Sequence, residues 1–225
     1  MFTALRCCVL STLIALASCK TSKVVLFHAD FDADTLGAAP ADPPGAPAGD
    51  GIHVPGSAAV VSNHSALGSK ALMISEGGTW GCFFQSDLTL GEFNNFRIFL
   101  TGSPADLEDG ELAIQVHPMG TDLNPVPVLT SLELRNGGIH GPGFPGPLSY
   151  DEDRIHSIIV NIDLVTRKYQ FTVMPGSTSP WFDLYSQTQS VNPIKGISVS
   201  LTVRGDPGGR YAVDHGWIYG LPGSG

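Results

Sequence analysis

The chain has 225 residues, a formal net charge of −9 and 15% charged residues. An acidic surface of this kind argues against a nucleic-acid partner and against charge-driven binding to anionic lipid head groups. The 27 glycines and 17 prolines favour short strands joined by turns and loops over long helices. The length suits one all-β domain with a sizeable core.

The chain begins with a segment built like a secretory signal. Met1 to Arg6 carries one positive charge, and the apolar run Cys7–Ala15 is too short to span a bilayer. Leu16-Ala17-Ser18-Cys19 then resembles the lipobox of bacterial lipoproteins, in which the signal is cut before the cysteine and the cysteine is acylated. The resemblance implies a signal peptide at residues 1–18, a lipid on Cys19 and a short lipidated tether at residues 19–23.

The lipobox resemblance also implies an address in the cell envelope, with membrane attachment through the lipid anchor. Lys20 follows the cysteine, where lipoproteins retained in the inner membrane often carry Asp, so the outer membrane is expected. If Cys19 is not acylated, an ordinary signal peptide remains and the protein is secreted. Cys7 and Cys8 leave with the signal, so no disulfide framework is expected. Cys82 is expected to be a small buried hydrophobe.

Alternating apolar and polar residues predict half-buried antiparallel strands. The alternation is strictest at residues 155–163, 169–173, 197–203 and 211–219, with a tight turn at 164–168. Shorter strands are predicted at residues 24–27, 58–61, 70–75, 80–85, 96–100, 111–116, 128–135 and 138–140. Residues 24–221 are therefore predicted to form a single β-sandwich of roughly ten to fourteen strands. The Pro/Gly-rich loop at 37–56 should hold no regular element.

Several turn and strand patterns resemble the concanavalin A-like lectin/glucanase jelly rolls of secreted bacterial proteins. They are Phe31-Asp32 with Leu36-Gly37, the Gly-x-x-Ala-Leu run Gly68–Leu72, the hairpin from Val160 through Asp163, Leu164 and Thr166 to Tyr169, and Val213-Asp214 in the closing strand. The resemblance implies an antiparallel β-sandwich of the concanavalin A-like jelly-roll type. It covers most of residues 24–220 and says little about function.

Four aspartates are candidates for a structural calcium site. Asp30, Asp32 and Asp34 alternate along the chain, and their oxygens can face one cation only if the backbone turns there. Jelly rolls that bind sugars often hold calcium between their first and last strands, and by resemblance Asp32 and Asp214 lie where such ligands would fall. The alternative is an acidic strand end followed by a capped turn.

Histidines on the predicted strands are expected to be structural. Asp214 and His215 are neighbours on a strand, so their side chains should point to opposite faces and not pair. His215 should share a face with Val213 and Trp217, and His156 should pack beside Ile158 and Val160. Trp217 and Trp80 also lie on strands, so both are expected in the core.

The best candidate for a ligand site is the segment after Pro180. Sugar rings stack on exposed aromatic rings while polar groups hold their hydroxyls. Trp181 and Tyr185 would supply the rings, with Asp183, Gln187 and Gln189 as hydroxyl partners. Filling an open end of the sandwich is an equally good explanation of Trp181.

The sequence thus predicts a non-catalytic, lipid-anchored carbohydrate-binding module with a polysaccharide or glycoconjugate as partner. A structural or protein-binding envelope lipoprotein is the alternative, and an exposed apolar patch would favour it. A polysaccharide hydrolase or lyase comes third. The paired carboxylates of glucanases on this fold, Glu-x-Asp-x-x-Glu along one strand, do not occur in this sequence.

Overall fold

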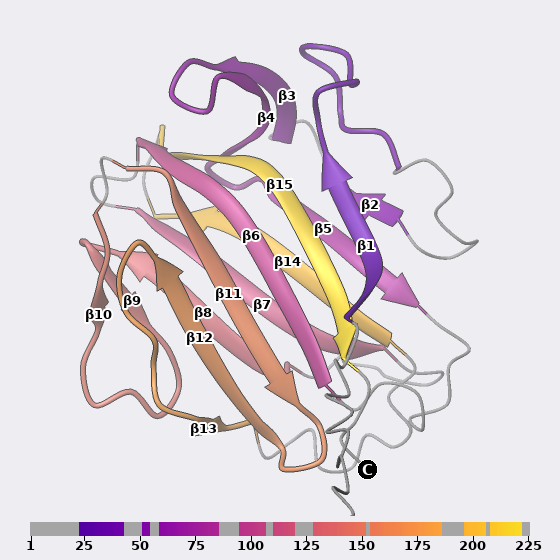
Figure 1. Ribbon diagram of the computed structural model, residues 1–225. Helices are drawn as coiled ribbons and strands as arrows, with labels where there is room; N and C mark the ends of the chain where they lie inside the picture. Colours follow the sequence, from indigo (N-terminus) through magenta and orange to yellow (C-terminus); the bar gives the residue numbers. More distant parts are fainter. Residues whose placement is uncertain are drawn as a thin grey trace, which may run out of the picture.

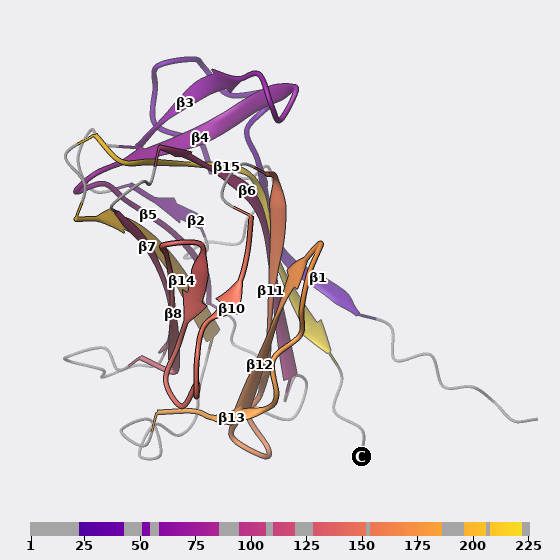
Figure 2. The same cartoon turned by 90° about the vertical axis from the view of Figure 1, so that its left-hand side faces the viewer.

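The computed structural model describes residues 23–42, 51–54, 59–85, 95–106, 110–119, 128–151, 154–185, 196–205 and 208–221. These residues form two antiparallel sheets that pack face to face as two layers (Figures 1 and 2). Within this part of the chain, no helix is long and apolar enough to cross a membrane.

The first sheet, called sheet A, contains both the first and the last described strands. Its order is β13-β12-β11-β6-β15-β4-β3, and β1 also pairs with β15, beyond the end of β4. The strands are β1 (Val24–Asp30), β3 (Ala59–His64), β4 (Ser69–Ser75), β6 (Asn95–Asp106), β11 (His156–Asp163), β12 (Lys168–Met174), β13 (Phe182–Asp183) and β15 (Arg210–Leu221).

The second sheet, called sheet B, faces sheet A across the core. Its order is β10-β9-β8-β7-β14-β5-β2. The strands are β2 (Gly51–His53), β5 (Thr79–Gln85), β7 (Glu111–Met119), β8 (Thr130–Arg135), β9 (Gly138–His140), β10 (Leu148–Ser149) and β14 (Gly196–Arg204).

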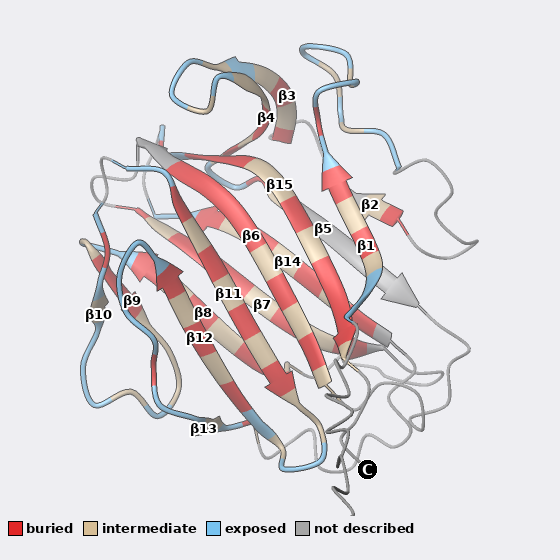
Figure 3. Ribbon diagram, viewed as in Figure 1, coloured by how far each residue is buried: buried red, intermediate tan, exposed pale blue. Residues whose placement is uncertain are grey.

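The period-two alternation of the sequence becomes the burial pattern of the sheets. Along β11, His156, Ile158, Val160 and Ile162 are buried and the residues between them are half-buried, which Figure 3 shows as alternating colours. Both sheets contribute such residues to one continuous core. Each sheet therefore presents its other face to solvent, where side chains are free to bind ligands.

The β11–β12 hairpin confirms the predicted tight turn. Asp163 closes it, because its carboxylate accepts bonds from the backbone N–H of Val165 (2.8 Å) and Thr166 (3.1 Å) and from the Thr166 hydroxyl (2.6 Å). Arg167 takes the left-handed conformation with φ 56°. A side chain that caps its own turn is the usual role of Asp in such loops.

Two short strands correct the sequence prediction. Gly51–His53 lies inside the stretch 37–56 expected to hold no regular element, yet it forms β2 by pairing with β5. Phe182–Asp183 lies in an expected loop, yet it forms β13 by pairing with Lys168 and Tyr169 of β12. Both strands are too short to show an alternation of apolar and polar residues. Each forms because a neighbouring strand offers backbone groups for hydrogen bonding.

Candidate functional site

The outer face of sheet A carries an ordered grid of side chains on β1, β15, β6 and β11. Strand register sets three rows, each running across the four strands. The first row is Val25, Tyr219, Arg97 and Asn161; the middle row is His28, Trp217, Phe99 and Ile159; the third row is Asp30, His215, Thr101 and Ser157. The middle row, called the aromatic strip below, is thus flanked on both sides by polar groups.

Close ring contacts hold the aromatic strip and its neighbours together. His28 stacks on Trp217 with ring centroids 3.5 Å apart, and Trp217 lies parallel to Tyr219 at 5.6 Å. His215 stacks on Phe99 at 5.8 Å and meets Trp217 edge-on at 6.4 Å. Burial lowers the pKa of His28 despite the opposing charge of Asp30, which favours the neutral imidazole that packs well against an indole.

A β-bulge in β15 overturns the prediction that Asp214 and His215 point apart. Val213 pairs with Gly102 and His215 pairs with Thr101, so Asp214 has no opposite residue on β6. The extra residue brings the two side chains together, with His215 Nδ1 2.8 Å from Asp214 Oδ2. For the same reason His215 does not share a face with the buried Val213; it is 30% exposed on the outer face.

The bulge completes a chain of hydrogen bonds across four strands. Ser69 Oγ donates to Asp214 Oδ1 (2.9 Å), His215 Nε2 lies 3.2 Å from Thr101 Oγ1, and Thr101 Oγ1 lies 3.0 Å from Ser157 Oγ. An ionised carboxylate only accepts, so Nδ1 of His215 is the donor to Asp214, and in the neutral tautomer with that proton Nε2 would accept from Thr101. Thr101 is only 9% exposed. These hydrogen bonds therefore hold the imidazole of His215 in place and do not present the Thr101 hydroxyl as a nucleophile.

Trp217 was predicted to lie in the core, and this prediction is wrong. Its indole is half-buried on the outer face of sheet A, whereas the side chain of the next residue, Ile218, packs in the core. The alternation of β15 was recognisable from sequence, but the bulge at Asp214 shifts its phase halfway along the strand. The side chain of Trp80, the other tryptophan assigned to the core, and that of Cys82 lie outside the described part of the structure.

Two cationic side chains border the aromatic strip on the Tyr219 side. Arg97 Nε donates to Asn161 Oδ1 at 2.7 Å, and Lys23 Nζ lies 4.1 Å from the centre of the Tyr219 ring. Tyr219 itself is 9% exposed beneath them. On the opposite side of the strip stand Asp30 and Asp214, so the grid is positive along one edge and negative along the other.

The candidate residues after Pro180 are divided between the two sheets. Trp181 is 47% exposed, and Asp183 is exposed at the edge of sheet A opposite Lys168. Tyr185 has crossed to sheet B, where its backbone N–H donates to Leu129 and its hydroxyl lies 3.4 Å from Ser131 Oγ. Gln187 and Gln189 lie outside the described residues, as does Cys19.

The four aspartates proposed for calcium do not converge. No group of three or more His, Cys, Asp or Glu side chains that could hold a metal ion occurs among the residues that the structure describes. The backbone does turn after Asp30, but the carbonyls of Asp32 and Asp34 are bound by Lys70 Nζ at 2.9 and 2.6 Å. The Lys70 ammonium thus takes oxygens that a cation there would need.

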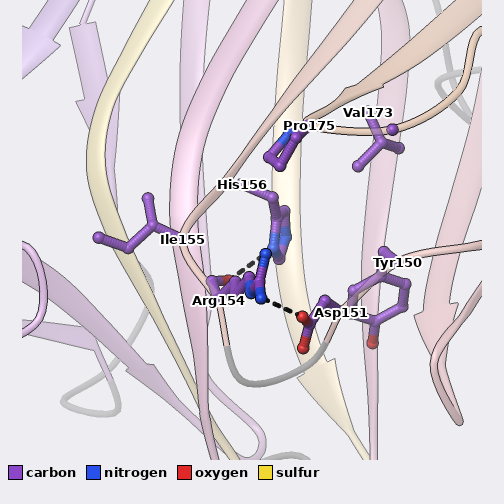
Figure 4. A pocket seen from close by; sticks show the side chains of 8 residues that line it. Tyr150, Asp151, Arg154, Ile155, His156, Val173 and Pro175 are labelled. Carbon is purple, nitrogen blue, oxygen red and sulfur yellow. Dashed lines mark hydrogen bonds and ion pairs between the residues drawn. The ribbon is translucent and has the colours of Figure 1, made fainter.

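His156 lines a pocket of about 310 Å³ at one end of the sandwich, together with Arg154, Asp151, Tyr150 and Pro175 (Figure 4). As predicted, His156 is packed: it is 3% exposed, and its nitrogens lie 3.1 Å from the Arg154 carbonyl and 3.1 Å from the Tyr211 hydroxyl. Burial lowers its pKa, so the ring is neutral at pH 7. With both nitrogens engaged, His156 supports the fold and is not placed to act as a base.

The outer face of sheet B is built from different residue types. Its register aligns Ser131, Gln115 and Ser200 in one row and Glu133, Ala113 and Thr202 in the next. His117 Nε2 lies 3.5 Å from Ser200 Oγ, and the hydroxyls of Thr79 and Thr202 are 3.1 Å apart. Small and polar side chains therefore line the described rows of this face over β7, β8 and β14 with hydroxyl and amide groups.

Comparison with known proteins identifies the fold. No protein-family model matches the chain, and no curated protein matches it. Among solved structures, it is similar to the conserved carbohydrate esterase of Shiga toxin-encoding bacteriophage phi24B, with a TM-score of 0.57 and 11% identity over 89% of this chain and 100% of that chain.

Two further structures have the same architecture. Arcelin-5, a lectin-like defence protein from Phaseolus vulgaris, has a TM-score of 0.51 and 11% identity over 76% of this chain and 93% of its own. A sialidase has a TM-score of 0.51 and 13% identity over 74% of this chain. The match covers only 16% of the sialidase chain. The protein is thus an all-β antiparallel sandwich of the concanavalin A-like jelly-roll class, as the sequence predicted.

Proposed function

We propose that this protein is a carbohydrate-binding module that holds a polysaccharide or glycoconjugate on the outer face of sheet A. One observation carries the proposal: the aromatic strip of His28, Trp217, Phe99 and Ile159 crosses four neighbouring strands between two rows of hydrogen-bonding groups. This arrangement replaces the loop after Pro180 as the preferred site.

The apolar faces of a sugar match the aromatic strip, and its hydroxyls match the polar rows on either side. A pyranose ring has apolar C–H faces, which gain free energy by covering aromatic and aliphatic side chains, and hydroxyls around its rim, which need partners. The aromatic strip offers the apolar surface. Asn161 and Arg97 on one side, and Ser157 and Asp30 on the other, offer donors and acceptors two residues along the strands from it.

The lipoprotein part of the proposal depends on the sequence motif at Leu16–Cys19. A lipid on Cys19 would tether the module to the cell envelope, in the outer membrane by the argument from Lys20, and hold the bound glycan there. Fatty-acid labelling that persists in the Cys19→Ser variant would rule this anchor out.

The test is glycan-array binding by the full chain in detergent, repeated with Trp217→Ala and Trp181→Ala. Trp217→Ala should weaken saturable binding at least about tenfold, since a central aromatic contact contributes about 1.4 kcal/mol or more. Trp181→Ala removes an equally large ring elsewhere on the surface and should change binding less than about twofold. Phe99→Ala provides a second variant of the strip should Trp217→Ala not fold.

Loss of binding in Trp181→Ala with full binding in Trp217→Ala would move the site to the loop after Pro180. Runs with calcium and with a chelator test whether glycan binding needs a metal ion, because a metal role requires weaker binding with the chelator. A folded protein that binds no glycan would refute the proposal.

A structural or protein-binding lipoprotein of the envelope is the second candidate, and one observation favours it. Val25, in the first row of the grid, is 50% exposed and its neighbour Val24 is 43% exposed, which extends the apolar surface toward the start of β1. Crosslinking on intact cells that captures one envelope protein through this face, with a blank glycan array, would select it. A polysaccharide hydrolase or lyase is third, and turnover of an array glycan would reveal it.

A further inference from the structure

The charges around the aromatic strip are arranged by sign. Arg97 and Lys23 stand on the Tyr219 side, whereas Asp30 and Asp214 stand on the His215 side. The protein as a whole has a formal charge of −9, so a place where two cations gather on an aromatic surface departs from its average. Local charge of this kind selects ligands by sign.

Arg97 is held in place without a carboxylate partner among the described residues. Its Nε donates to the neutral Asn161 side chain at 2.7 Å, which orients the guanidinium. By contrast, Arg135, Arg154 and Arg204 each pair with a glutamate or aspartate. No carboxylate of the described residues therefore competes for the guanidinium of Arg97, and its planar fork matches a carboxylate that arrives from outside.

Lys23 adds a second charge on the same side. Its ammonium lies over the Tyr219 ring, 4.1 Å from the centroid, at the start of β1. Tyr219 pairs with Arg97 of β6 in the sheet register, so both cations belong to the Tyr219 side of the strip. Together they create a positive edge along the first row of the grid.

The distance between rows suits a single sugar ring. Side chains two residues apart on a strand lie about 7 Å from each other. A pyranose centred on Trp217 and Phe99 therefore places a substituent of its ring over Arg97 and Tyr219. Asp30 and Asp214 on the His215 side of the strip repel an anion, so the ring would enter in one orientation only.

We propose that the glycan is acidic, and that the carboxylate of a uronic-acid-type sugar binds Arg97 and Lys23 while its ring covers Trp217 and Phe99. The proposal rests on the proposed function, because it names the sugar class for the same surface. Neutral glycans would bind the strip more weakly, since they leave the two cations without a counter-charge.

The experiment compares oligogalacturonate with the same oligomer fully methyl-esterified, using the full chain and isothermal titration. The methyl ester keeps the ring and removes the charge. We expect the free acid to bind about tenfold more tightly at low salt, and this preference to shrink as salt is raised. Arg97→Gln should remove most of the preference, and Lys23→Gln a smaller part of it.

Arg204→Gln is the matched control, because it makes the same change of charge on the outer face of sheet B. It should leave both affinities within about twofold. Equal binding of the acid and the ester, lost in Trp217→Ala, would overturn the acidic preference and leave the carbohydrate-binding function standing. Binding of neither oligomer, with neutral glycans bound on the array, would also overturn the acidic preference. Binding of no glycan at all would overturn both.

Discussion

The two outer faces of this sandwich follow the same alternation of residues, yet among the side chains that the structure describes only the face of sheet A carries a row of stacked aromatic rings. On sheet B, β14 pairs with β5 and β7 without a register shift, and its outward residues are serine and threonine. On sheet A, register shifts interrupt β15 beside β6 and β1 beside β15. An uninterrupted ladder keeps every side chain where the pattern puts it, whereas a bulge moves side chains to a new position.

The bulge at Asp214 explains what is unusual about the face of sheet A. It brings a carboxylate beside an imidazole and switches the outward position from the even-numbered Ala212 to the odd-numbered His215, Trp217 and Tyr219. Without it, these three rings would point toward the core. The difference between the faces thus comes from one extra residue as much as from composition.

The largest effect should come from Gly102→Ala, which tests how β6 is joined to β15 behind the aromatic strip. A Cβ at Gly102 would lie 2.5 Å from the Ala212 carbonyl oxygen and 2.6 Å from the Tyr211 ring. Both neighbours are held within the sheet, so we expect a loss of about 2–3 kcal/mol in the free energy of unfolding, measured by urea denaturation.

Gly146→Ala is the control for that substitution, because nothing lies within 4 Å of its Cβ position and its φ is not positive. It should change the free energy of unfolding by less than about 0.5 kcal/mol. Equal losses in the two variants would mean that β6 and β15 are not packed as closely as described.

A smaller effect is expected from Asp214→Asn, which tests the hydrogen bonds made possible by the bulge. The amide cannot provide the same charge-assisted bond to His215 Nδ1, so the free energy of unfolding should fall by about 1 kcal/mol. NMR of the imidazole nitrogens should report the Nδ1–H tautomer of His215 in the parent protein and a mixture in the variant.

Asp183→Asn serves as the control, since Asp183 is also on sheet A but exposed at its edge. It should change neither the free energy of unfolding nor the His215 signals. An Nε2–H tautomer in the parent protein would contradict the direction of the hydrogen-bond chain from Ser157 to Asp214.

The smallest effect should come from Gln115→Ala and Ser200→Ala on the outer face of sheet B. If sugars bind the aromatic strip, these changes alter the glycan affinity less than about twofold, because each removes only half-buried polar atoms from the opposite sheet. Loss of binding in Gln115→Ala, with binding retained in Trp217→Ala, would exchange the roles of the two faces.

Much of the fold was readable from period and turn chemistry. The strands at β11, β12, β14 and β15, the turn closed by Asp163, and the sandwich itself followed from alternation and from one recognisable hairpin. The proposed site on sheet A was not readable, because its aromatic residues come from three separate strands; the site in the loop after Pro180 stays a prediction. Trp181 and Asp183 lie at the edge of sheet A, whereas Tyr185 contacts sheet B.

The residues of the aromatic strip had only weak sequence patterns that could indicate a binding site. His28, Trp217 and Phe99 come from segments far apart in the sequence, and nothing in any one of them indicates that β1, β15 and β6 are neighbours. Trp217 and Tyr219 alternate with a period of two. However, the side of the sheet on which they lie changes at Asp214, and the sequence does not show the bulge there.

The sequence by itself determined that this protein folds as an antiparallel sandwich, since burying one side of each strand requires only the period-two pattern. Tertiary structure alone decided which side of β15 faces solvent, where the short strands β2 and β13 form, and which charges border the aromatic strip. The reason is that a bulge, an edge pairing and a row of side chains depend on the register between strands, and register is a property of pairs of segments rather than of either one.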